Sequence, residues 1–64
     1  MQPHQQRVVD EANELNDKRE KLSAFISGNP IFSGLDMVQQ GLMKTQLHAM
    51  TAYLEVLNLR ISYF

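Results

Sequence analysis

Apolar residues in the second half of the chain recur at alternating steps of four and three, the spacing of an amphipathic helix. One such set runs through Met43, Leu47, Met50, Leu54, Leu57, Ile61 and Phe64. A second set keeps the same steps through Leu35, Val38, Leu42, Thr45, Ala49, Ala52, Val56, Leu59 and Tyr63. The two sets are offset by two residues, which is a rotation of about 200° at 3.6 residues per turn. The pattern therefore predicts a helix over about residues 36–64 that is apolar on two sides.

The first half of the chain carries a single apolar stripe. Its members, at steps of three, four or seven, are Val8, Ala12, Leu15, Leu22 and Ile26. Pro3 stands where a first-turn proline is tolerated, because its missing N–H would be unpaired there anyway. Arg19 interrupts the stripe, and we expect its aliphatic stem to lie along the seam with the guanidinium at the edge. These features predict a helix over about residues 3–27.

A connector over about residues 28–35 separates the two helices. Gly28 can take the left-handed conformation that ends many helices, and the sequence Asn29-Pro30 resists helical continuation. Ile31 and Phe32 are apolar in a segment that would ordinarily be polar, so we expect them to plug the open end of a hairpin in one short helical turn. Asp36 lies three residues before Gln39, the spacing of a capping pair.

The expected fold is all-α, a single domain over residues 1–64 built as an antiparallel two-helix hairpin. Because the first helix can cover only one stripe of the second, we expect the hairpin to complete its core by forming a homodimer or a higher oligomer. The predicted interface comprises Val38, Leu42, Ala49, Ala52, Val56, Leu59 and Tyr63. The alternative is that the small members of this stripe simply lie half exposed, as single surface residues often do.

Length and composition favour the same conclusion. A chain of 64 residues has a marginal core, and such domains add disulfides, a metal or oligomerisation. Cysteine is absent and the two histidines are far apart, so neither a disulfide nor a metal site is expected, and no cofactor is. The net charge of −1 disfavours nucleic-acid binding, which usually needs a basic excess. No signal peptide or membrane span is recognisable, so a cytoplasmic protein is expected.

The residues that could carry catalysis lack a catalytic setting. The carboxylate pairs Glu11–Glu14 and Asp17–Glu20 alternate with basic residues on what looks like a solvated face. His48 falls on a polar strip of the second helix. Neither a nucleophile elbow nor a phosphate-binding glycine loop is present. We therefore expect that the protein is not an enzyme.

A line of four polar and aromatic residues is the candidate ligand site. Its members recur every seven residues along one edge of the second helix: Gln39, Gln46, Tyr53 and Arg60. Arg60 offers bidentate hydrogen bonds to phosphate, and Tyr53 offers a stacking surface and a hydroxyl. The alternative is a polar edge that flanks an apolar seam, as in coiled coils.

Several segments resemble small helical-hairpin proteins of tailed phages and prophages that are named by relation to a crAss-like phage protein. The resemblance rests on residues 1–11, on residues 21–26 and on scattered positions between Gln46 and Phe64, and it covers nearly the whole chain. The chain departs from that family between Phe32 and Gln40, where more acidic residues are typical. A shorter segment, Val38–Met43, is similar to hairpins of phage anti-defence proteins that sequester cyclic nucleotides as oligomers.

The resemblance implies a non-enzymatic phage or prophage accessory protein that acts by binding. Its target would be a host defence protein or a nucleotide signal, and its action would be counter-defence in the host cytoplasm. Two alternatives remain from the sequence: a structural or assembly protein of the phage particle, and a dimeric DNA-binding regulator, which the charge disfavours.

Overall fold

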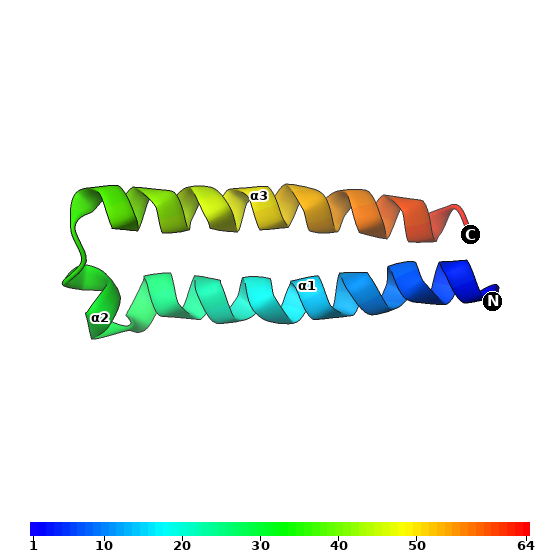
Figure 1. The fold of residues 1–64 in the computed structure, drawn as a ribbon, viewed down its shortest axis with the longest axis horizontal. Coiled ribbons are helices and arrows are strands. Elements are labelled where there is room, and N and C mark those ends of the chain that lie inside the picture. Colours follow the sequence, from blue (N-terminus) through cyan, green and yellow to red (C-terminus); the bar gives the residue numbers. More distant parts are fainter.

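The structure, a computed structural model, describes residues 1–64 and contains three helices. These are α1 (Pro3–Gly28), α2 (Pro30–Ser33) and α3 (Met37–Ser62). The helices α1 and α3, of 26 residues each, lie antiparallel and side by side, with α2 at one end (Figure 1). The chain contains no strand, which confirms the predicted all-helical class and the pair of long helices.

Local hydrogen bonds fix the start of α1. Pro3 is the first helical residue, and the side-chain oxygen Oε1 of Gln5 accepts a hydrogen bond from the backbone N–H of Gln2 at 2.9 Å. This pairs one of the amide groups that every helix N-terminus leaves without an intrahelical partner. The side chain of Gln5 therefore does part of the work of a capping box.

The end of α1 differs from the sequence expectation, because no glycine of the chain has a positive φ. Gly28 stays helical, so the prediction of a left-handed cap there is wrong. Asn29 instead turns extended, with φ −90° and ψ 125°, as the residue before a proline prefers. The N–H of Asn29 still donates to the carbonyl oxygen of Phe25 at 3.2 Å, so the break leaves this carbonyl paired.

The connector forms the short helix α2, and only one of its two apolar residues plugs the hairpin. Phe32 is buried, whereas Ile31 is 66% exposed, so the expectation is confirmed for Phe32 and wrong for Ile31. Adjacent residues of a helical turn point about 100° apart, so only one of them can face the gap between α1 and α3. Asn29 caps α2, its Oδ1 accepting from the N–H of Ile31 at 2.9 Å.

Two side chains anchor the start of α3. Asp36 Oδ1 accepts a hydrogen bond from the N–H of Gln39 at 2.8 Å, which confirms the predicted capping pair. Gln40 Nε2 lies 3.1 Å from the carbonyl oxygen of Phe32, 3.0 Å from that of Leu35 and 3.4 Å from that of Ser33. The amide of Gln40 therefore ties the connector to the first turn of α3.

The core lies along the seam between α1 and α3. Val8, Ala12 and Leu57 are buried in contact with one another, and three partly buried residues pack around them: Leu15, Leu54 and Ile61. This is the seam that the first stripe of the second helix predicts. At the chain end Phe64, the last member of that stripe, is 45% exposed. Leu57, at 1% exposure, is the only side chain that is fully buried, so the fully buried part of the seam is small.

The molecule is a rod of 46 × 15 × 13 Å. Its radius of gyration is 14.5 Å, against about 11 Å for a compact chain of this length. Its accessible surface is 4828 Å², against about 4200 Å² for a monomeric protein of 7.4 kDa. Neither long helix has a stretch apolar enough to cross a bilayer.

Candidate functional site

The four residues of the predicted ligand line all lie on the surface of α3. Each is exposed, and Tyr53 is exposed to 47%. Successive members stand about 10.5 Å apart along the helix axis, because seven residues rise 1.5 Å each. The whole line is therefore about 31 Å long. A ligand the size of a nucleotide can contact two neighbouring members of the line, and the full set cannot converge on one small molecule.

The C-terminal pair of the line, Tyr53 and Arg60, has the strongest binding chemistry. Tyr53 presents an aromatic face, and Arg60 is the basic residue of the last turn of α3. A cation there is stabilised by the carbonyl dipoles of the helix end. Side chains of this length, one helical repeat apart, can meet the ring and the phosphate of one bound molecule.

The second apolar stripe of α3 lies uncovered in the chain. Val38 is 70% exposed, Leu42 59%, Val56 53%, Leu59 61% and Tyr63 88%. The two small predicted interface residues, Ala49 and Ala52, are exposed as well. All seven predicted interface residues, together with Thr45, which lies between them and is also exposed, therefore form one accessible face, called the outer stripe below, that no part of the same chain covers.

The larger hollow in the surface is elsewhere, at the elbow between α1 and α2. It is open to solvent, has a volume of about 570 Å³ and is lined by Lys21, Ala24, Phe25, Gly28, Asn29 and Pro30. A smaller hollow of about 240 Å³ borders the same elbow and shares Gly28, Asn29 and Pro30 with the first. No residue of the ligand line borders either hollow. In the sequence, only the break at Asn29-Pro30 indicates this elbow.

The ionisable residues that were weighed as catalytic candidates lie dispersed on the surface. Glu11, Glu14, Asp17, Glu20 and His48 are all exposed. No group of three or more histidine, cysteine, aspartate or glutamate side chains lies close enough to hold a metal ion. The structure therefore gathers none of these residues into a common site.

Arg19 is the one cation drawn into the seam. Its side chain is partly buried, and its Nε has no hydrogen-bond partner although it is shielded from solvent. Its Nη2 donates to Oδ1 of Asn16 at 3.4 Å, a long hydrogen bond within α1. The expected placement of the stem along the seam agrees with this burial. The unpaired Nε is a feature that spacing alone could not reveal.

Comparison with known families assigns this helical hairpin to a family. The model of the family described as Sequestin matches residues 2–63, which is nearly the full length. The chain belongs to the Sequestin family. The match spans both long helices, the elbow, the ligand line and the outer stripe. Comparison with curated proteins and with solved structures yields no match to either.

Proposed function

We propose that this member of the Sequestin family acts by stoichiometric binding and holds its ligand without transforming it. The observation that carries the proposal is the family match over residues 2–63, since the family name denotes sequestration. The exposed line on α3 supplies groups suited to such a role. The side chains on this line can stack and form hydrogen bonds, and binding without turnover requires no further chemistry.

The ligand class proposed for the line is a small phosphorylated molecule with an aromatic ring, such as a cyclic nucleotide. Tyr53 would stack on the base, because tyrosine offers a flat apolar face with a polar tip. Arg60 would hold the phosphate through two parallel hydrogen bonds. Gln46, about 10.5 Å before Tyr53 along the axis, would reach the polar edge of the base.

The biological setting proposed is counter-defence by a phage or prophage. The likeness of residues 1–11 and of residues 38–43 to phage hairpin proteins supports it. Removing a nucleotide signal needs one binding site per captured molecule and no turnover. A small hairpin with an exposed binding edge meets that requirement.

Calorimetric titration with a panel of cyclic mono- and dinucleotides tests this function. One ligand of the panel is expected to bind, and Tyr53→Ala and Arg60→Ala are each expected to weaken its binding at least about tenfold, or about 1.4 kcal/mol. Lys18→Ala, at an exposed position of α1, is the matched control and should leave the affinity unchanged. After heat denaturation of the complex, the bound nucleotide should be recovered chemically intact. Recovery of a cleaved product would contradict sequestration.

A second candidate, inhibition of a host defence protein, is favoured by the outer stripe. Exposed apolar patches of this kind mark protein–protein contacts. The two candidates predict opposite variant effects. Capture of a nucleotide fails in Arg60→Ala, whereas inhibition of a protein through the stripe fails in Leu59→Glu and survives Arg60→Ala. A structural role in the particle would instead show as a fixed copy number in purified phage.

A further inference from the structure

The outer stripe of α3 is symmetric in its spacing. From Val38 to Tyr63 the steps are four, three, four, three, four, three and four, which read the same in both directions. The centre of symmetry lies midway between Met50 and Thr51. Bulky side chains occupy both ends of the stripe, and the small residues Ala49 and Ala52 flank its centre.

We infer that α3 pairs with α3 of a second copy in an antiparallel two-fold dimer, with the axis at that centre. The two-fold places every stripe residue opposite another stripe residue. Val38 meets Tyr63 of the partner copy, Leu42 meets Leu59, Thr45 meets Val56, and Ala49 meets Ala52. Large pairs at the ends and small pairs in the middle let the two helices approach closely where they cross.

The surface of the chain is of the size that such a contact needs. The accessible area of 4828 Å² exceeds that of a compact monomer of this mass by about 600 Å². A stable interface buries about 800 Å² on each partner. Five large side chains of the stripe, exposed by 53% to 88%, are available for such a contact along the full length of α3.

The residues that border the stripe are also complementary under the same two-fold. On one border, Glu55 lies beside His48 of the partner copy, a carboxylate next to an imidazole. On the other border, Arg60 lies beside Gln39 of the partner copy and Tyr53 beside its Gln46. No pair of like charges meets along either border of the antiparallel pair.

The two-fold also joins the ligand lines of the two copies. At about 100° per residue, the arc from the α1 seam to the outer stripe measures about 150° on the side of the ligand line and about 210° on the other. The two lines therefore face into one shallow trough between the two α1 helices. Each Tyr53 there has Gln46 of the other copy as its neighbour, so the partner copy contributes to the candidate site.

Double electron–electron resonance on spin-labelled protein tests the direction and register of the pairing. The native chain has no cysteine, so Met37→Cys and Asn58→Cys each give one label per copy. Both positions are exposed: Asn58 lies on the side of α3 away from the stripe, and Met37 lies on the border that also carries Glu55. Along the axis the two-fold sets the paired labels about 40 Å apart at residue 37 and about 22 Å apart at residue 58. Equal distances at the two positions would overturn the antiparallel arrangement.

Analytical ultracentrifugation of charge variants tests the contact without any ligand. Leu59→Glu is expected to raise the dimer dissociation constant at least about 100-fold, since it buries an unpaired charge. The doubly substituted chain Leu42→Glu, Leu59→Lys places opposite charges against each other only in the antiparallel dimer. It is expected to dimerise at least about tenfold more tightly than Leu42→Glu, Leu59→Glu.

Circular dichroism of each variant at high concentration checks that the hairpin remains helical, and Lys18→Glu on exposed α1 is the matched surface control. If the wild-type protein remains a folded monomer at a concentration 100-fold above micromolar, the proposal is overturned. The stripe would then be available to bind a different protein. Equal dissociation constants for the two double variants would also overturn it. Because no nucleotide enters these measurements, their failure is independent of any failure of the sequestration function.

Discussion

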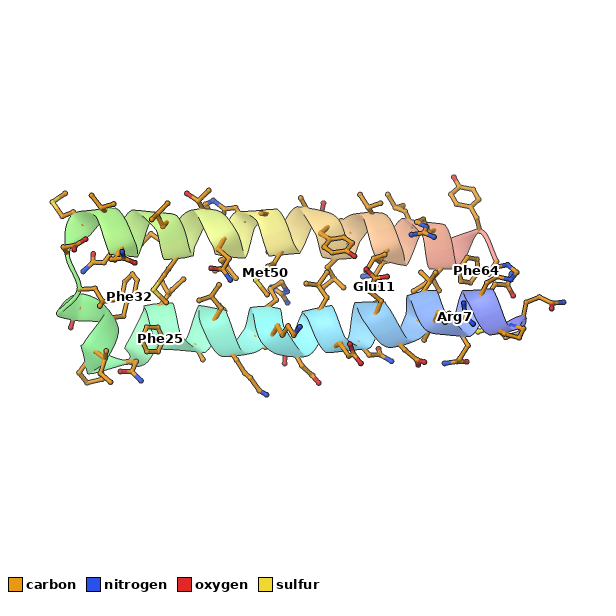
Figure 2. The ribbon with its side chains drawn as sticks, in the orientation of Figure 1. Arg7, Glu11, Phe25, Phe32, Met50 and Phe64 are labelled. Carbon is orange, nitrogen blue, oxygen red and sulfur yellow. The ribbon has the colours of Figure 1, made fainter.

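The rings of Phe25 in α1 and Phe32 in α2 meet edge to face, with 6.2 Å between their centroids and 80° between their planes (Figure 2). Lys44 of α3 brings its Nζ to 6.0 Å from the centre of the Phe32 ring. Phe32 is therefore the residue at which all three helices come together, and it closes the end of the seam that α1 and α3 leave open.

Replacing Phe32 with alanine is expected to lower the free energy of unfolding by about 3 kcal/mol, because it empties a buried aromatic site. Ile31→Ala, at the adjacent and exposed position, should change it by less than about 0.5 kcal/mol. Urea titration followed by circular dichroism measures both. Equal losses for the two variants would mean that the orientation of α2 is wrong.

Gln40→Ala is expected to lower the free energy of unfolding by about 1–2 kcal/mol, because connector carbonyls then lose their amide donor. Gln46→Ala, on the exposed edge of the same helix, serves as the control and should be nearly neutral. Amide hydrogen exchange at the elbow gives a second measurement. Exchange of the N–H groups of residues 34 and 35 should accelerate in Gln40→Ala only.

Gly41→Ala should stabilise the hairpin by about 0.5–1 kcal/mol, because glycine is costly inside a helix. A Cβ at this position meets nothing within 4 Å in the chain. The converse substitution at an exposed position of α1, Ala24→Gly, should cost about 1 kcal/mol. Thermal unfolding at a fixed protein concentration measures both. A loss of stability in Gly41→Ala would reveal a close neighbour from another copy.

Arg19→Leu is expected to raise the free energy of unfolding by about 1 kcal/mol, since it removes a shielded, unpaired Nε and keeps an apolar stem in the seam. The neighbouring exposed change Lys18→Leu should give no such gain. Chemical denaturation compares the two. If Arg19→Leu proves destabilising, the guanidinium must find a partner that the single chain does not provide.

The long elements and the thin seam could be predicted from the sequence because they follow from periodic spacing. Steps of three and four place Val8, Leu54 and Leu57 on facing sides of two helices, and the Asp36 cap follows from a local pair. The elbow could not be predicted in the same way. Which of Ile31 and Phe32 turns inward depends on the direction in which the chain leaves Asn29. The spacing of apolar residues does not predict this direction.

The features of the candidate site likewise fall into those that the sequence predicts and those that it does not. Exposure of the ligand line and of the outer stripe follows from the geometry of one helix, since α1 can cover only one side of α3. The reach of Gln40 across the connector, and the shielding of Arg19 Nε, depend on how separate elements come to rest against each other. Such contacts join residues of different elements, and the residue pattern within one helix does not predict them.

Both chain ends of the rod lie at the same end, opposite α2 (Figure 1). A reporter fused to either terminus therefore stands clear of the elbow and of the long face of α3. In a two-fold antiparallel pair, halves of a split fluorescent protein on the two C-termini would be held about 40 Å apart along the helix axis and would stay dark. Moving one half into the connector at Gly34 would bring it alongside the other and restore the signal, so the position of the fusion reports the relative direction of the two α3 helices inside cells.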